Sequence, residues 1–164
     1  MNKERYKKMM QHFAEHPEQV SALQFLDTLL TIGFVFSYID LLLLHKESDK
    51  LIPLIAVPAV GLILISLLRE WINKPRPAEA YGLSSALQKK KPGRSFPSRH
   101  VFSAFLIAFS CFYAGEASMG WLMSILALVV ALIRVCGGLH FVSDAVAAVL
   151  CALLASLIGY GLIF

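Results

Sequence analysis

Three short segments of the sequence carry side chains that could handle a phosphate group. They are Arg69–Pro77 (REWINKPRP), Pro97–His100 (PSRH) and Arg134–Asp144 (RVCGGLHFVSD). Arginine binds phosphate through a planar set of charge-assisted donors, and histidine can act as a nucleophile or exchange a proton near neutral pH. Three arginines, two histidines and one carboxylate from these segments are the groups needed for phosphoryl transfer through a covalent intermediate: Arg69, Arg76, Arg134, His100, His140 and Asp144.

The third segment has the spacing of a histidine oriented by a carboxylate. His140 follows two glycines that permit a tight turn, and Asp144 comes four residues later, at the start of the last apolar run. Residues four apart share a helix face, so the carboxylate can hold one imidazole nitrogen and leave the other bare and basic. The same pattern is also typical of a structural histidine beside an aspartate that the helix dipole stabilises.

The other two segments are suited to binding an anion. Ser98 is an N-cap candidate, and a helix N-terminus with a hydroxyl and free backbone N–H groups binds anions. His100 could protonate a leaving oxygen there, although a lone histidine at a membrane interface is more often structural. Arg76 lies between two prolines that fix its position, and Arg69 ends an apolar run. An interfacial arginine pair is a common alternative interpretation of these two residues.

The chain that carries these segments is too apolar for an ordinary soluble domain. It has 164 residues, 57% of them hydrophobic and 16% charged, with a mean hydropathy of +0.67. The apolar residues form runs about as long as a bilayer is thick. Only helices fit runs of this length in lipid, so the fold class is all-α: a single domain (1–164) forming an integral membrane helical bundle of about five transmembrane helices. The expected spans are 25–44, 51–68, 100–114, 119–133 and 141–164.

The N-terminal residues 1–24 are expected to lie at the membrane interface. An amphipathic helix is predicted over 3–16, where apolar side chains recur at helical spacing and Pro17 interrupts the pattern. Asp27 and Asp40 fall near the ends of the first span, which favours side chains that reach interfacial water over a proton relay. The three cysteines have neither metal-site nor disulfide spacing.

Positive charge is concentrated in residues 69–99, a basic active-site loop with eight of the fifteen Lys and Arg residues. This loop includes Lys89–Lys91, a run more typical of a solvated, topology-setting charge than of ligands. With no nucleic-acid-binding motif, anionic headgroups or a phosphorylated substrate are the expected partners, and nucleic acid is not. Five spans place thirteen of the fifteen cations on one side. The positive-inside rule then predicts a multi-pass protein of the cell membrane with its site on the cytoplasmic side.

Taken in order, the three segments resemble the signature motifs of the type 2 phosphatidic acid phosphatase (PAP2) superfamily. Those motifs are Lys-x6-Arg-Pro, Pro-Ser-Gly-His and Ser-Arg-x5-His-x3-Asp, and the similarity spans residues 69–144. The superfamily includes lipid phosphatases, acid phosphatases and vanadium haloperoxidases. The resemblance therefore implies a PAP2/haloperoxidase-like helical core.

The resemblance also implies a role for each residue. His140 would attack phosphorus to form a phosphohistidine, Asp144 would orient it, and His100 would protonate the leaving group and later activate water. The phosphoryl oxygens would be held by four residues: Arg69, Arg76, Arg134 and Ser98. Cationic side chains replace a metal in this scheme, so neither a metal nor another cofactor is expected.

Three positions depart from the family pattern. Arg69 stands where the family has lysine, with Lys74 as a possible stand-in that could bind substrate. Arg99 replaces glycine beside His100 and could also contact substrate, which bears on the headgroup accepted. Ile133 replaces the serine before Arg134. These changes affect substrate choice more than the chemistry.

The sequence therefore predicts a membrane-embedded lipid phosphate phosphatase. Its substrate would be a lipid phosphomonoester or diphosphate, such as phosphatidylglycerol phosphate, phosphatidic acid or undecaprenyl diphosphate. Two alternatives stay open: a vanadate-dependent oxidase, and a non-enzymatic protein that binds or transports anionic lipids. The family's lipid phosphatases usually have six spans and an extracytoplasmic site, whereas here two spans precede the first motif. The oligomeric state is left open by the sequence.

Overall fold

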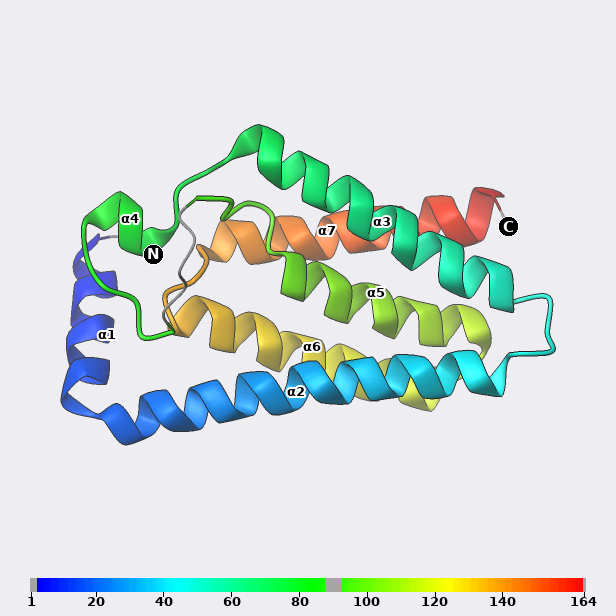
Figure 1. Cartoon of the computed structure of the whole chain (residues 1–164), viewed down its shortest axis with the longest axis horizontal. Helices are drawn as coiled ribbons and strands as arrows, with labels where there is room; N and C mark the ends of the chain where they lie inside the picture. The colour runs from blue at the N-terminus through cyan, green and yellow to red at the C-terminus, as the bar shows by residue number, and fades with distance from the viewer. Residues whose placement is uncertain (1–2, 88–92, 164) are drawn as a thin grey trace.

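The computed structural model describes residues 3–87 and 93–163, and within these ranges it is helical with no strand. The helices run back and forth along one long axis (Figure 1). In chain order they are α1 (Lys3–Glu15), α2 (Pro17–Leu44), α3 (Leu51–Ile72), α4 (Pro77–Tyr81), α5 (Arg99–Ala114), α6 (Ala117–Cys136), α7 (Val142–Ile158) and a final π-helical turn, η1 (Gly159–Ile163).

Four stretches of the described chain are long and apolar enough to cross a membrane. They are α2, α3 with its continuation through α4, α6, and α7 with η1. The fifth apolar helix, α5, has 16 residues and is about 24 Å long, which is less than a hydrocarbon core of about 30 Å. The expected all-α membrane bundle is thus confirmed, with four full-length helices and one short helix.

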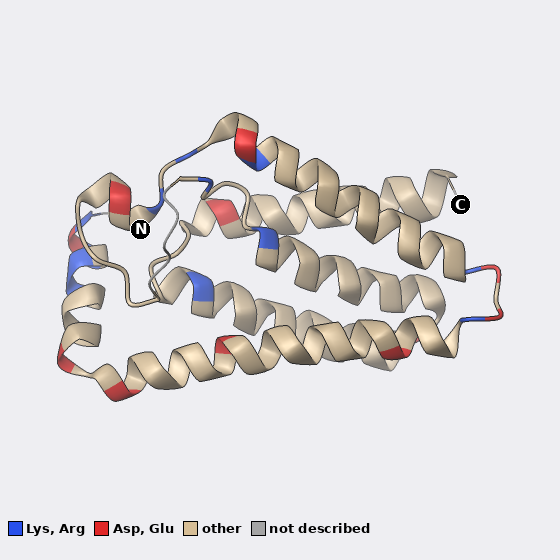
Figure 2. Cartoon of the chain, viewed as in Figure 1, with Lys and Arg blue, Asp and Glu red and all other residues tan. Residues whose placement is uncertain are grey.

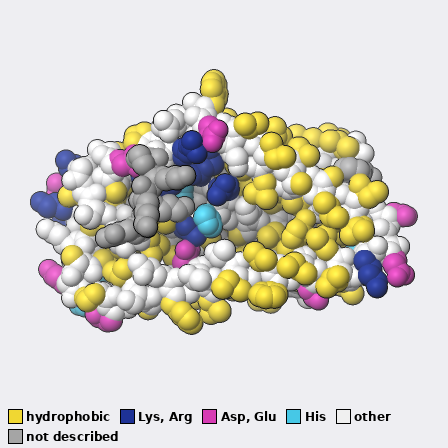
Figure 3. Space-filling model, in the orientation of Figure 1, with side chains coloured by type: hydrophobic (Ala, Val, Ile, Leu, Met, Phe, Trp, Pro, Cys, Tyr) yellow, Lys and Arg dark blue, Asp and Glu magenta, His cyan; other side chains and the backbone are white. Residues whose placement is uncertain are grey.

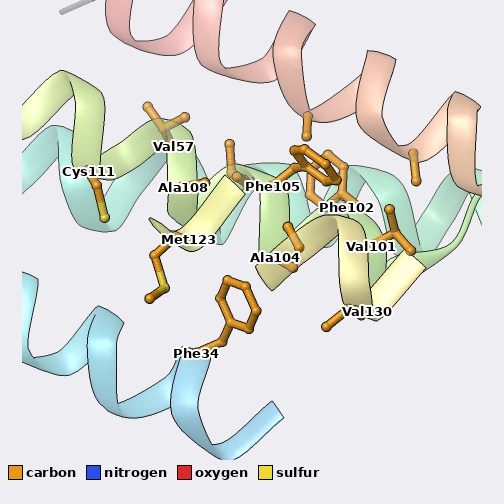
Figure 4. Close-up of a cluster of buried hydrophobic side chains, with 14 of the residues drawn as sticks. Phe34, Val57, Val101, Phe102, Ala104, Phe105, Ala108, Cys111, Met123 and Val130 are labelled. Atoms are coloured by element: carbon orange, nitrogen blue, oxygen red, sulfur yellow. The ribbon is translucent and has the colours of Figure 1, made fainter. Parts of the chain in front are cut away.

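The short helix α5 forms the core of the bundle. It packs against α6, α7, α3 and α2, and Figure 4 shows its buried side chains meeting those of the neighbouring helices. In α3, a Cβ added at Gly61 would lie 3.1 Å from the Phe102 ring, so glycine allows the close approach of α3 to α5. Small residues give membrane helices their packing contacts, because lipid provides no hydrophobic drive for association. Enclosed in this way, α5 does not have to match the bilayer thickness by itself.

The outer surface is apolar along most of its length. Large hydrophobic side chains on the outer helices are exposed, including Phe25 at 70% and Ile52 at 70%. Figure 3 shows yellow side chains covering most of the visible flank. An apolar surface of this extent is typical of a protein surrounded by lipid.

Helix α1 lies across one end of the bundle (Figure 1). Its Tyr6 is buried, donates a hydrogen bond to the Ser84 carbonyl oxygen at 3.1 Å and packs on the Tyr81 ring. At Gly138, where φ is +77°, an added Cβ would lie 2.8 Å from the Tyr6 hydroxyl, so this contact requires glycine. The expected N-terminal helix is observed, but residues 17–24 are not part of it, because Pro17 starts α2 instead.

The ends of the bundle differ in charge. Figure 2 shows most Lys and Arg residues at the end where α1 and α4 lie. The segments Arg69–Pro77, Pro97–His100 and Arg134–Asp144 lie at that end, and the α2–α3 turn, the α5–α6 turn and η1 lie at the other (Figure 1). The run Lys89–Lys91 falls outside the described residues.

Candidate active site

Backbone contacts join the three segments at the charged end of the bundle. The Ser95 N–H donates to the Lys74 carbonyl oxygen at 2.8 Å, and the Ser98 N–H donates to the Asp144 carbonyl oxygen at 3.0 Å. The loop that leads into α5 is therefore held between the end of α3 and the first turn of α7. Residues far apart in the sequence are close together, as the five-span topology predicted.

The Asp144 carboxylate has several polar partners at this end of the bundle. It is fully buried in the first turn of α7. Its Oδ1 lies 2.7 Å from Lys74 Nζ. Its Oδ2 accepts hydrogen bonds from Ser95 Oγ at 2.6 Å and from the Phe141 N–H at 3.1 Å. Both carboxylate oxygens are satisfied, which fixes a negative charge in a buried position.

His140 is oriented by a backbone carbonyl group as well as by a carboxylate. Its Nδ1 lies 2.8 Å from the Ser95 carbonyl oxygen and 3.9 Å from Asp144 Oδ2. The sequence suggested that Asp144 would reach the ring on a shared helix face. However, α7 begins at Val142, so His140 lies in the preceding turn and its closest acceptor is Ser95.

This contact determines which imidazole nitrogen is free. A carbonyl oxygen can only accept, so the hydrogen lies on Nδ1 of the His140 ring and Nε2 keeps its lone pair. Burial lowers the pKa of the His140 imidazole below its ordinary 6.5; nearby Asp144 opposes this shift, and the charges of Arg76 and Arg69 favour it. The ring is thus held neutral, in the tautomer that a nucleophile requires.

Arg69 and Arg76 are buried and hold the loops around His140. The Arg69 guanidinium donates to the carbonyl oxygens of Pro97 and Arg94. Arg76 Nη1 donates to the Leu139 carbonyl oxygen at 3.2 Å. A guanidinium has five N–H donors, so each arginine still has donors for an anion after these bonds.

Arg134 is neutralised by a residue from the first long helix. Its Nε lies 2.8 Å from Asp27 Oδ1, and the two side chains are 5% and 17% exposed. The expectation that Asp27 reaches interfacial water is therefore wrong. Helix α2 begins at Pro17 rather than near residue 25, which places Asp27 about 15 Å along the helix, and there it faces α6.

Lys74 forms an ion pair with Asp144, and its side chain is partly exposed. Besides Asp144, its ammonium contacts Ser143 Oγ at 3.4 Å and lies over the rings of Phe96, at 5.3 Å, and Phe141, at 4.8 Å. These contacts hold it as a counter-ion of Asp144. The role of Lys74 as a substrate ligand in place of the family lysine stays a prediction.

The N-terminus of α5 has a polar group that is not satisfied internally. Ser98 is the N-cap residue and is fully buried, yet its side chain does not cap the helix. Its Oγ makes no hydrogen bond within residues 3–87 and 93–163. A buried hydroxyl without a partner is costly, and an anion bound at the helix N-terminus would satisfy it.

His100 and Arg99 line one end of an apolar groove of about 340 Å³. The groove continues along α5 to Ile107 and is closed by residues of α2 and α3, among them Phe34, Tyr38, Pro58 and Leu62. His100 is half-buried and Arg99 exposed. Figure 3 shows Lys and Arg side chains gathered beside the apolar flank.

Sequence reasoning missed two residues of this arrangement, Ser95 and Asp27. Ser95 contacts both Asp144 and His140, but no motif singles it out. The contact of Asp27 could have been predicted, because an acidic residue in an apolar span needs a cationic partner and Arg134 lies at the end of another span. In the described part of the chain, no three His, Cys, Asp or Glu side chains are grouped to share a metal ion.

Fold and site together define a helical membrane protein with a cationic site at one end of its bundle. The family model of the PAP2 superfamily matches residues 50–164. That is more than half of the chain, and the protein therefore belongs to the PAP2 superfamily. The resemblance of the three motifs is confirmed. The comparison with curated proteins finds no match.

Two solved structures share the fold. LpxE of Aquifex aeolicus has a TM-score of 0.72 and 23% identity, over 95% of this chain and 92% of that one. A transmembrane PAP2-type phosphatidylglycerolphosphate phosphatase from Bacillus subtilis has a TM-score of 0.68 and 21% identity, over 96% of this chain and 84% of that one. Both cover α2 as well as the matched family region.

Proposed function

We propose that the protein is a membrane phosphatase that removes phosphate from a lipid phosphomonoester or diphosphate through a phosphohistidine. The observation that carries the proposal is the hydrogen bond from His140 Nδ1 to the Ser95 carbonyl oxygen at 2.8 Å, which leaves Nε2 as a free base in a buried, cationic site. Membership of the PAP2 superfamily supports the same chemistry.

In the first step, the Nε2 lone pair of His140 attacks phosphorus and the bond from phosphorus to the leaving oxygen breaks. His100, in its protonated form, gives its proton to that oxygen. Buried Asp144 and the Ser95 carbonyl group stabilise the positive charge that forms on the His140 ring. Neutral His100 then takes a proton from water, whose oxygen attacks phosphorus and releases His140 and inorganic phosphate.

The phosphoryl oxygens would be bound by the remaining donors of three arginines, together with Ser98 and the first N–H groups of α5. Because Ser98 Oγ has no described partner, it can donate to an anion without breaking an internal bond. Charge that develops on these oxygens is stabilised by fixed cations in a buried site, where electrostatic interactions are strong. No metal is required by this scheme, and EDTA tests that part of it.

The apolar groove supports a lipid as the substrate. It begins at His100 and Arg99, and its lining includes apolar residues that are exposed on the flank of α2, such as Val35 and Ile39. A hydrocarbon chain can therefore enter from the bilayer while its phosphate lies near His100. Apolar lining with a few polar groups at one end is typical of sites for amphipathic ligands.

The first experiment is inorganic phosphate release by detergent-purified protein in EDTA. Phosphatidylglycerol phosphate, phosphatidic acid and undecaprenyl diphosphate serve as substrates. We expect turnover that is abolished in His140→Ala and retained in His45→Ala. His45 is a matched control because it follows α2 at the end of the bundle opposite the site. His100→Ala should lose most turnover with poor leaving groups and less with good ones. Equal activity of His140→Ala and His45→Ala would disprove the proposed mechanism.

We also propose that the site faces the cytoplasm, as the charge distribution favours. In a background without the native cysteines, Glu79→Cys reports on the site end and Glu47→Cys on the opposite end; both positions are exposed. A thiol reagent that cannot cross the membrane should label Glu47→Cys in intact cells and Glu79→Cys only after permeabilisation. The reverse pattern would place the site on the outer face.

A further inference from the structure

The ion pair between Asp27 and Arg134 joins the first long helix to the site. Arg134 is 4% exposed as a residue, at the last turn of α6, and its Nε contacts Asp27 Oδ1 at 2.8 Å. A buried guanidinium requires a counter-ion to offset the cost of removing its charge from water. Asp27 is the only acidic residue that forms an ion pair with Arg134 within the described ranges.

Asp27 lies outside the region that defines the family. The family match begins at residue 50, whereas Asp27 belongs to α2 (Pro17–Leu44). The arginine that it contacts lies inside the match, at the start of the third motif. Helix α2 thus supplies a charged group to a site that is otherwise built from the matched region.

The geometry leaves Arg134 able to bind an anion. Its guanidinium has five N–H donors, and Asp27 has two carboxylate oxygens. Even with one N–H on each oxygen, three donors remain. The contact at Nε is an ion pair without hydrogen-bond geometry, so the place of the guanidinium, and with it the position of the remaining donors, depends on the charge of Asp27. A displacement of about 1 Å in such a group costs up to a hundredfold in rate.

We propose that Asp27 is a positioning residue that orients Arg134 toward the phosphoryl group of the substrate. The inference deepens the proposed function and rests on it, because it assigns Arg134 to phosphate binding. If the pair only fastened α2 to α6, its loss would lower stability without a specific effect on anion affinity.

The test measures binding of orthovanadate, an analogue of phosphate, by calorimetry on the full-length protein in detergent. Asp27→Asn removes the charge and keeps the shape. Asp40→Asn is the matched control, since Asp40 is an exposed aspartate on the same helix. Loss of one charge-assisted contact predicts about tenfold or more weaker vanadate binding in Asp27→Asn, with kcat/KM lowered in parallel. Asp40→Asn should bind as wild type does.

Two further variants separate positioning from folding. Asp27→Glu keeps the counter-ion and the fold but moves the guanidinium, so affinity should lie between wild type and Asp27→Asn, with Asp40→Glu unchanged. In an Arg134→Gln background, Asp27→Asn should cause no additional loss, because it acts through Arg134.

The proposal would be overturned if both Asp27→Asn and Asp27→Glu bound vanadate with wild-type affinity. If Asp27→Asn does not fold, wild-type affinity in Asp27→Glu alone would overturn it. The proposed function fails in a different way: the wild-type protein would then bind vanadate without releasing phosphate from any lipid, and this result would leave the vanadate comparison intact.

Discussion

Lys74 Nζ lies 2.7 Å from Asp144 Oδ1, so the carboxylate beside His140 has a cationic partner from the segment that follows α3. The other carboxylate oxygen is bound by Ser95 and the Phe141 N–H. Asp144 thus balances the charge of Lys74 and stays within 3.9 Å of the His140 ring. Lys74 is a positioning residue for the carboxylate in this arrangement.

Lys74→Gln should lower kcat/KM, because Asp144 loses a charge-assisted contact of about 1.5–3 kcal/mol, equivalent to roughly a ten- to hundredfold change. Phosphate release from the preferred lipid measures the effect. Lys50→Gln is the control, since Lys50 bonds the Ala114 carbonyl oxygen at the opposite end. If Lys74→Gln matches Lys50→Gln in activity, Lys74 has no part in the site.

Ser95→Ala should reduce kcat about tenfold and leave KM nearly unchanged. The substitution removes the hydroxyl bond to Asp144 Oδ2 at 2.6 Å but keeps the carbonyl group that orients His140, and a hydrogen bond to a charged group contributes about 1.5 kcal/mol or more, which is roughly tenfold in rate. Ser124→Ala, which loses only a bond within α6, is the control. Steady-state kinetics on both variants measure kcat and KM separately. An effect confined to KM would contradict the prediction.

The pH dependence of kcat/KM should have an acid limb with its midpoint below 6.5. Burial lowers the pKa of His140, so Nε2 stays unprotonated and nucleophilic at pH values where an exposed histidine is already charged. Activity is then lost only as the pH falls through the lowered pKa. A rate profile from pH 4.5 to 8, with protein shown to stay folded at each pH, measures it. A midpoint above 6.5 would contradict this assignment.

Arg99→Gly should change substrate preference. Arg99 is exposed beside His100 at the groove, where it can contact a second anionic group next to the phosphate that is cleaved. Loss of this contact predicts a drop of about tenfold in kcat/KM for a diphosphate lipid and a smaller drop for phosphatidic acid. The ratio of the two values is the readout, and an equal decline for both lipids would exclude Arg99 as a selector.

Ser103→Leu should impair turnover of lipids but spare a small soluble ester such as para-nitrophenyl phosphate. Ser103 is half-buried and lines the groove, so leucine at this position would occupy the space for a hydrocarbon chain. Ser66→Leu on α3 is the control. Equal losses with both substrates would mean that the groove does not hold the lipid chain.

The sequence predicts much of the fold because membrane helices follow directly from apolar run length. It also predicts that the three segments meet, since each of them lies at the end of an expected span on the same side of the membrane. Helix boundaries were less accurate: α2 starts earlier than its apolar run, because polar residues after Pro17 continue the helix.

Contacts made only in three dimensions could not be predicted. The carbonyl of Ser95 orients His140, and a backbone group has no signature in a side-chain pattern. Likewise, Asp27 was assigned from its position in an apolar run, whereas its partner depends on how α2 rotates against α6. Lys74 was recognised as a cation, but its ion pair with Asp144 could not be predicted, because its position in the sequence says nothing of that carboxylate.

The groove along α5 opens on the side of the bundle, between α2 and α3, rather than at its end. A lipid substrate would reach His100 by lateral diffusion, with its chains never leaving the bilayer. The concentration that governs such an enzyme is the mole fraction of substrate in the membrane plane, not its amount per volume of buffer. Diluting the substrate with inert lipid should then slow the reaction, whereas diluting the vesicles that contain enzyme and substrate should not.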